Sequence, residues 1–256
     1  MKKQRFHERS AVITGASRGI GRATAIVLAR EGADLLLHGR DETALNGLQQ
    51  ELNIYGGNYA VCIADLGQPG YAEKIVRSAQ CELGRIDVLI NNCGGGVAKQ
   101  PFHELPVNQL QKVYQLNLES VFLLTQQVIP VMLKQQYGRI VNVASLAGRK
   151  YSPLACADYT MAKAGLIGLT RQLAMEYASQ GIGINAAAPG ITLSERIVDR
   201  WNQKTDEQRK QIVSETPMGR PAQLEEVALP IAFLASDEAA YITGHTLDIN
   251  GGAMMN

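Results

Sequence analysis

Tyr159 and Lys163 are the side chains of this chain best suited to proton transfer. They stand four residues apart in the stretch YTMAK, which has helical periodicity, so both side chains rise from one face of the predicted helix, one turn apart. A phenol titrates near about pH 10 in isolation, and a neighbouring ammonium favours the phenolate. Tyr159 could therefore serve as an acid or a base. Taken alone, the pair could also be an ordinary tyrosine and a solvated helix lysine.

A glycine-rich turn, TGASRGIG over residues 14–21, joins an apolar strand to a helix. Gly15 lets the chain leave the strand in a tight turn, Gly19 allows the backbone to approach a pyrophosphate, and Gly21 allows the helix to pack closely on the strand. The helix N-terminus adds N–H donors and a positive dipole end. The spacing differs from the commoner GxGxxG pattern, and any tight strand-to-helix turn favours glycine. The turn indicates a nucleotide phosphate site without establishing one.

Short apolar runs alternate with helix-period segments along the chain, a pattern that predicts βαβ units. We expect strands over residues 11–14, 34–39, 59–64, 88–91, 139–144, 183–188 and 246–249. We expect helices over residues 19–31, 42–53, 70–83, 107–136, 157–179 and 224–235. The fold class is therefore α/β, a Rossmann-type, doubly wound, seven-stranded parallel sheet with helices on both faces, in a single domain over residues 1–256.

The charged segment 192–217 interrupts this alternation between the sixth and seventh strands and holds the only tryptophan. An insertion beyond the carboxyl end of a strand is a natural position for a substrate lid. A solvated helix pair with no role in the site is the alternative.

The composition excludes several functions. The chain has 25 basic and 24 acidic residues and a formal charge of +1, so we expect neither nucleic acid nor an anionic membrane surface as a partner. Its uninterrupted apolar runs are far shorter than the roughly 20 residues of a bilayer span, and its first ten residues are polar, which predicts a cytoplasmic protein. Four cysteines and four histidines are scattered without ligand spacing, which predicts reduced thiols and no metal.

The turn TGASRGIG resembles the cofactor turn of the compact short-chain dehydrogenase/reductases. Further motifs of that family follow in chain order: Asp65-Leu66, Asn91-Asn92-Cys93-Gly94, Asn117, Ser145, Tyr159-x3-Lys163 and Pro189-Gly190. They cover nearly the whole chain and fall where ligands bind in open α/β sheets. The resemblance implies an oxidoreductase that transfers a hydride between a nicotinamide cofactor and a ketone or secondary alcohol.

The same resemblance implies roles for four catalytic residues. Tyr159 is the general acid or base, and Lys163 also binds the nicotinamide ribose. Ser145 holds and polarises the substrate oxygen, and Asn117 links the lysine to solvent through its main chain and a water. Ser145 and Tyr159 are one position further apart than is common in the family, so the loop over 149–158 carries an extra residue that reshapes one wall of the pocket.

Two arginines favour NADP(H) over NAD(H). Gly39 stands where NAD-preferring members place an Asp, and Arg40 and Arg18 could clamp a 2′-phosphate. The alternative is that Arg40 pairs with Asp41 or Glu42 and that Arg18 faces solvent. By resemblance, Asp65 accepts a hydrogen bond from the adenine amino group. The full set of expected cofactor contacts is Gly15, Ser17, Arg18, Gly19, Ile20, Gly21, Arg40, Asp65, Leu66, Asn92, Gly94, Tyr159, Lys163, Pro189, Gly190 and Thr192.

The stretches AKAGLIGLTRQLA and FLASDEAAYITGHTLDINGG resemble the 3-oxoacyl-[acyl-carrier-protein] reductases, which implies a 3-keto substrate. Those reductases carry basic residues at the pocket rim to dock the acidic carrier, whereas the matching positions here are Gln136 and Gln180. This departure favours a free small-molecule substrate. Lys134, Arg139 and Arg171 could substitute for the missing basic residues.

The sequence also bears on assembly and on two alternative functions. The helices over 107–136 and 157–179 carry apolar residues on more than one side, and family members commonly form tetramers, so we expect a homo-oligomer, with a monomer as the alternative. A non-catalytic NADP-binding sensor and a sugar-nucleotide epimerase-like enzyme remain as alternative functions. The sensor is disfavoured because all four expected catalytic side chains are present, and the epimerase is disfavoured because the chain lacks an added substrate domain.

Overall fold

The computed structural model describes residues 4–96, 100–152 and 154–255 and contains the expected seven-stranded parallel sheet. The strand order is β3-β2-β1-β4-β5-β6-β7, so the order reverses between β1 and β4, at the point where α/β sheets bind ligands. The strands are β1 Ser10–Thr14, β2 Asp34–Gly39, β3 Tyr59–Ile63, β4 Val88–Asn91, β5 Gly138–Val143, β6 Ile182–Pro189 and β7 Thr246–Ile249.

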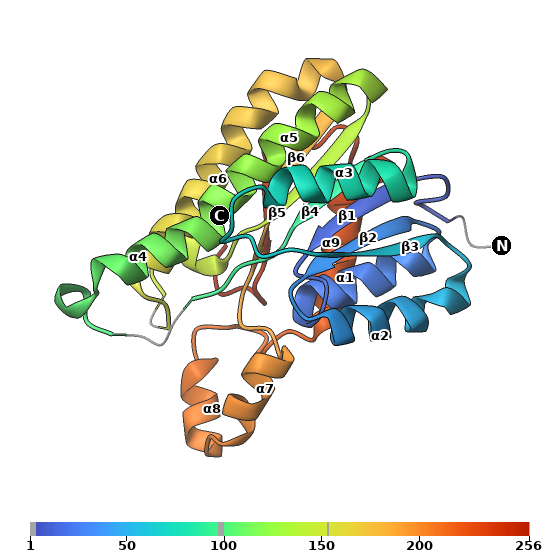
Figure 1. Cartoon of the computed structure of the whole chain (residues 1–256). Coiled ribbons are helices and arrows are strands. Elements are labelled where there is room, and N and C mark those ends of the chain that lie inside the picture. Colours follow the sequence, from blue (N-terminus) through green and yellow to red (C-terminus); the bar gives the residue numbers. More distant parts are fainter. Residues whose placement is uncertain (1–3, 97–99, 153, 256) are drawn as a thin grey trace.

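Helices cover both faces of this sheet (Figure 1). One layer holds α1 Gly19–Arg30, α2 Glu42–Leu52 and α9 Leu224–Ala235, and the other holds α3 Tyr71–Leu83, α4 Val107–Tyr114, α5 Ser120–Gln135 and α6 Ala157–Tyr177. The alternation of side chains along a strand supplies both cores, because Ala11 and Ile13 of β1 pack toward the first layer while Val12 packs toward the second. The expected helices are confirmed, with ends that differ by at most two residues.

The long helix expected over 107–136 is continuous but not uniform. A π-helical turn at Gln115–Glu119 joins α4 to α5. The run Val107–Gln135 is long and apolar enough to cross a membrane, and 44% of its most apolar window is buried. Leu124, Val128 and Met132 of α5 belong to the core on one face of the sheet, so in this structure the run serves as a core helix.

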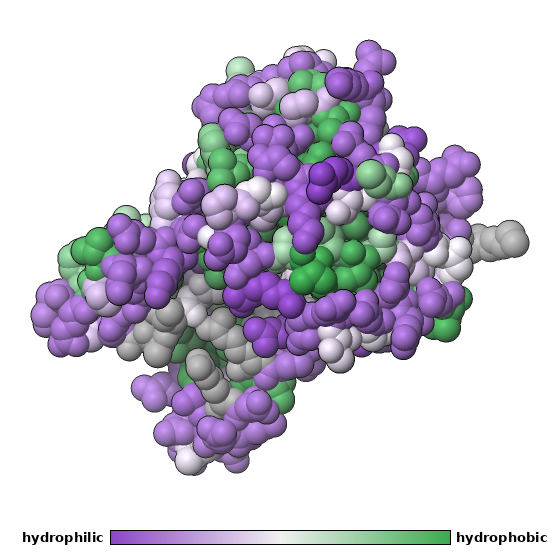
Figure 2. Space-filling view, in the orientation of Figure 1, coloured by the Kyte–Doolittle hydropathy of each residue, from purple (hydrophilic) through white to green (hydrophobic). Residues whose placement is uncertain are grey.

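The charged segment between β6 and β7 folds into two short helices, α7 Glu195–Asn202 and α8 Asp206–Ile212. Thr205 and Gln208 form a capping box that starts α8. Both helices project away from the sheet in Figure 1, and their outer surface is hydrophilic in Figure 2. Their base is fixed, because Leu193 N–H donates to the Ala222 carbonyl at 2.9 Å and Ala222 N–H donates to that of Ile191 at 2.8 Å.

Candidate active site

The predicted site residues gather at one edge of the sheet, where the strands end. Because the strands are parallel, the turns that follow them share that edge. The turn after β1 and the start of α1 hold Gly15, Ser17, Arg18, Gly19, Ile20 and Gly21. The turns after β2 to β5 hold Arg40, Asp65, Leu66, Asn92, Gly94 and Ser145, and the end of β6 with the turn after it holds Pro189, Gly190 and Thr192.

Lys163 is buried inside this edge and lies beside Tyr159 on α6. Its Nζ is 5.7 Å from the centre of the Tyr159 ring and donates a hydrogen bond of 2.8 Å to the Val143 carbonyl, at the end of β5. Burial lowers the pKa of Lys163 to about 8. A Cβ at Gly148 would approach the Lys163 carbonyl carbon to 2.7 Å, so only glycine permits this contact between the loop after β5 and α6. The structure thus brings the expected pair together and places a buried cation next to the phenol.

Asn117 lies in the π-helical turn and fixes the loop that follows β4. Its Oδ1 accepts from Gly95 N–H at 2.9 Å, and its Nδ2 donates to the carbonyls of Gly95 at 3.0 Å and Val113 at 2.8 Å. The side chain, which is fully buried, therefore acts as a clamp on this loop. The expected relay role concerned the main chain and a water, and it stays a prediction.

In that loop Gly94 was expected as a cofactor contact, whereas Gly96 was overlooked as a site residue. A Cβ at Gly94 would lie 2.7 Å from Asn117 Oδ1 and 3.1 Å from Lys163 Nζ, and a Cβ at Gly96 would lie 3.3 Å from the Tyr159 ring. The loop thus passes directly over the predicted catalytic side chains, which leaves little room for larger residues. The run of three glycines after Cys93 was the available signal.

Ser145 directly follows β5 and begins a short 3₁₀ turn, Leu146–Gly148. Its Oγ accepts from Ala147 N–H at 3.2 Å, which leaves the hydroxyl hydrogen available for donation to a substrate oxygen. The loop beyond it is tied to β7 by Arg149, which donates to both carboxylate oxygens of Asp248 at 3.2 and 2.9 Å.

Asp158, next to Tyr159, is a site residue that sequence reasoning missed. It is 2% exposed, and its Oδ1 accepts from the Tyr159 backbone N–H at 2.7 Å. Its Oδ2 accepts from Gln109 Nε2 of α4 at 3.0 Å, and Gln109 Oε1 accepts from Gln100 Nε2 at 2.7 Å. This chain of hydrogen bonds anchors the first turn of α6 to α4. An acidic residue in the first turn of a helix is common, so its type alone gave no signal.

The glycine-rich turn has the conformation that its sequence predicts. Gly15 and Gly19 have φ values of +67° and +59°, in the region that glycine occupies without strain. A Cβ at Gly21 would collide with the Gly15 carbonyl oxygen, so this third glycine permits close packing of α1 on the turn. Asn92 Nδ2 holds the turn by donating to the carbonyls of Thr14 and Gly15 at 2.9 and 3.2 Å.

The two arginines proposed to bind a 2′-phosphate are both exposed at this edge. Arg40 Nη1 lies 3.6 Å from Asp65 Oδ2. Asp41 caps α2 by accepting from Ala44 N–H at 3.0 Å. The structure therefore pairs Arg40 with the acidic residue of the expected adenine site, and not with either of the neighbours considered as the alternative.

The expected position of Gln136 and Gln180 at the rim of the catalytic pocket is wrong. Both line a cavity of about 540 Å³ with Leu133, Ser179 and Gly181, beside the residues that begin β5 and β6. Ser145 follows the opposite end of β5. Parallel strands put these two ends at opposite edges of the sheet, so neither glutamine borders the catalytic residues within one chain.

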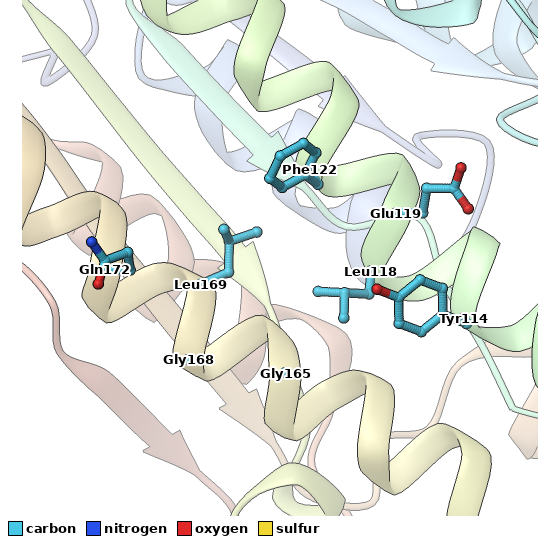
Figure 3. A pocket seen from close by; sticks show the side chains of 8 residues that line it. All are labelled: Tyr114, Leu118, Glu119, Phe122, Gly165, Gly168, Leu169 and Gln172. Atoms are coloured by element: carbon cyan, nitrogen blue, oxygen red, sulfur yellow. The ribbon is translucent and has the colours of Figure 1, made fainter.

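A second cavity, of about 490 Å³, lies between α5 and α6 and contains none of the predicted site residues (Figure 3). Phe122 and Tyr114 border it and are 47% and 48% exposed. Gly168 of α6 has open space where a Cβ would be, so the absence of a side chain there helps to form the hollow in the surface of α6.

Comparisons with known proteins agree with this geometry. The family model described as enoyl-(acyl carrier protein) reductase matches residues 15–254. The 3-oxoacyl-[acyl-carrier-protein] reductase of Escherichia coli is 38% identical over 250 residues, which cover 98% of this chain and 99% of the relative.

Solved structures of reductases and dehydrogenases also resemble this chain over nearly its whole length. Levodione reductase superposes with a TM-score of 0.91 at 32% identity and covers 97% of this chain and 98% of its own. A 7α-hydroxysteroid dehydrogenase complexed with NADH and 7-oxo glycochenodeoxycholic acid has a TM-score of 0.91 at 30% identity, over 99% and 97% of the two chains. The chain therefore belongs to the short-chain dehydrogenase/reductase family, resembles its 3-oxoacyl-[acyl-carrier-protein] reductases, and is an oxidoreductase acting on CH–OH or carbonyl groups.

Proposed function

We propose that this chain reduces a ketone to a secondary alcohol with NADPH, and that Tyr159 is the proton donor. The observation that carries the proposal is the buried ammonium of Lys163 beside the Tyr159 ring, at the edge where the glycine-rich turn also lies. A cation held there favours the phenolate that remains once Tyr159 has given its proton to the carbonyl oxygen. The nicotinamide cofactor supplies the hydride when bound.

Each protein group has one task in this step. The carbonyl carbon receives the hydride, the carbonyl oxygen receives the Tyr159 proton, and the product is the alcohol. Ser145 donates a hydrogen bond to the same oxygen as negative charge develops on it. Lys163, tied to the Val143 carbonyl, keeps its charge at a fixed distance from the phenol. In the reverse direction Tyr159 acts as the base.

The residues present fit a dinucleotide. The turn has the positive φ angles that let the backbone approach a pyrophosphate, and the N-terminus of α1 points its N–H groups there. Arg40 and Arg18, both exposed at the carboxyl edge, support a preference for the 2′-phosphate of NADP(H), and Gly39 places no carboxylate there to repel it. Arg40 would exchange its long 3.6 Å contact with Asp65 for a phosphate.

The relatives' names point to two kinds of substrate. Some are named for 3-oxoacyl groups on an acyl carrier protein, and others for levodione or for a hydroxysteroid. The two positions matched to the basic carrier-docking residues, Gln136 and Gln180, carry no positive charge and lie at the edge of the sheet opposite the catalytic residues of the same chain. We therefore propose a free small-molecule ketone or 3-ketoacyl thioester as the substrate. The sensor and epimerase alternatives receive no support, since the relatives described above are named reductases or dehydrogenases.

A substrate panel tests this function. Purified protein is mixed with NADPH and with free 3-ketoacyl thioesters, the same acyl groups on a carrier protein, cyclic ketones or keto sugars, and loss of NADPH absorbance is followed. We expect turnover with a free ketone or thioester, and no increase in kcat/KM when the same acyl group is attached to the carrier protein. A higher kcat/KM for the carrier-linked form would refute the substrate proposal, and failure of every ketone and alcohol to react would refute the reductase.

We also propose that the chain assembles through α5 and α6. The cavity between these helices and the half-exposed Phe122 and Tyr114 form an apolar face that a second copy could cover (Figure 3). This face lies outside the catalytic residues, so assembly would leave the site open.

A further inference from the structure

A carboxylate of this chain occupies the glycine-rich turn. Glu195, the first residue of α7, accepts a hydrogen bond of 2.9 Å at its Oε2 from Gly19 N–H, the first residue of α1. Residue 18, which caps α1, makes no side-chain hydrogen bond to the helix. A Cβ at Gly19 would lie 3.4 Å from Ser194 Cβ and 3.8 Å from Glu195 Oε2. The start of α7 therefore sits directly on the turn.

Glu195 and a diphosphate would use the same feature of the turn. The N-terminus of α1 offers unpaired N–H donors and the positive end of a helix dipole, and both favour one anion close by. The Gly19 N–H is a single donor, and two anions within hydrogen-bond distance of it would repel each other. A cofactor diphosphate bound against Gly19 must therefore displace the carboxylate.

We propose that Glu195 is an internal competitor for the diphosphate part of the cofactor, so that cofactor binding releases the first turn of α7. This inference rests on the proposed function, because it needs a dinucleotide at this turn. The competition lowers the affinity for NADPH and NADH alike, since both carry the same diphosphate. It also couples occupancy of the cofactor site to the position of the segment 192–217.

The attachment of this segment suits such a release. Residues 191 and 193 are hydrogen-bonded to Ala222, so the chain has a fixed point just before Glu195. Beyond it, α8 has no buried residue among those that the structure describes. At the far end, Lys150 Nζ contacts Glu215 Oε2 at 3.0 Å, and Glu215 is exposed. Val213, directly after α8, is buried, and the two carboxylates at residues 195 and 215 add exposed contacts with the body of the protein, which are weak.

Equilibrium binding to the full-length protein tests the proposal. NADPH and NADH are titrated separately by calorimetry into the wild type and into the variants Glu195→Gln and Glu195→Ala. The control is Asp199→Asn, which removes the same charge one turn further along α7. We expect both Glu195 variants to bind each cofactor about two- to fivefold more tightly, since an interaction of an exposed carboxylate with a helix N-terminus has this strength. The control should match the wild type.

The outcomes separate this inference from the function on which it rests. If the wild type binds neither cofactor, the proposed function fails. If the wild type binds, and the Glu195 variants bind equally or more weakly, the competition is refuted while the function stands. Tighter binding of NADPH alone would also refute it, because a diphosphate competitor cannot distinguish the two cofactors. Hydrogen exchange gives a second measurement: amides of residues 195–202 should exchange faster in Glu195→Ala without cofactor than in the wild type.

Discussion

Replacing Lys163 with methionine should change how the stability of the protein depends on pH. Burial lowers the pKa of this lysine from its ordinary 10.5 to about 8. The difference corresponds to a penalty of about 3 kcal/mol for holding the charged form in the folded protein. Methionine has a similar length and no charge, so it removes this penalty. It also removes the donor to the Val143 carbonyl, a cost that does not depend on pH.

The direction in which stability changes with pH depends on whether the folded or the unfolded state holds the proton. Below about pH 8 the lysine is protonated in both states, and the full penalty weakens the wild type. Between about pH 8 and 10.5 the folded lysine has lost its proton while the unfolded one keeps it, so the free energy of unfolding rises with pH. Relative to Lys163→Met, the wild type should therefore gain about 3 kcal/mol across this range.

Urea unfolding followed by far-ultraviolet circular dichroism measures this difference at several pH values. Tryptophan fluorescence is unsuitable because the only tryptophan, Trp201, lies on α7 and reports on that segment. Titrating groups that do not interact with Lys163 cancel in the comparison of two variants. Lys112→Met, at an exposed position on α4, is the control and should track the wild type. A difference between Lys163→Met and wild type that stays constant with pH would show that the folded site does not depress the lysine pKa.

Four further outcomes are expected. Tyr159→Phe should lower turnover by about 10²- to 10⁴-fold and change NADPH affinity only a few-fold, and substantial remaining turnover would mean that another group donates the proton. Arg40→Ala should weaken NADPH binding about tenfold and leave NADH binding unchanged, whereas equal losses for both cofactors would refute the 2′-phosphate contact. Gly94→Ala places a methyl group 2.7 Å from the Asn117 oxygen and should cost about 1–3 kcal/mol in thermal unfolding, while Gly47→Ala, which has open space around it, should not destabilise. Phe122→Glu should reduce the apparent mass in size-exclusion chromatography with light scattering, and an unchanged mass would exclude this face as the interface.

The sheet and the phosphate turn could be predicted because local sequence determines both. Strands buried on two faces, such as β1, are short apolar runs whichever way their side chains point, and positive φ angles at Gly15 and Gly19 restrict those positions to glycine. The same reasoning located Tyr159 and Lys163, since residues four apart in a helix must lie on one face.

Contacts between distant segments were not predictable. Glu195 lies 176 positions from Gly19, in a charged stretch whose composition is that of a solvated helix. Gln136 and Gln180 are a different case: both precede predicted strands of a parallel sheet, so their place at the edge away from the site was available from the sequence, and the match to a family position was wrongly preferred. Asp158 resembles any acidic residue in a first helical turn until its burial against α4 is known.

Because of the π-helical turn at Gln115–Glu119, deleting one residue at this point of the helix would change the geometry of the site. A π-turn accommodates one more residue than an α-turn, so deleting a single residue there would let ordinary helical hydrogen bonds form throughout. The two halves of the helix would then rotate about 100° relative to each other. Since α5 is anchored in the core by Leu124, Val128 and Met132, it would stay in place, and Asn117 and α4 would rotate. Such a deletion would leave the helix intact but would move the Asn117 side chain away from the loop after β4. The protein would then fold and yet lose catalytic activity.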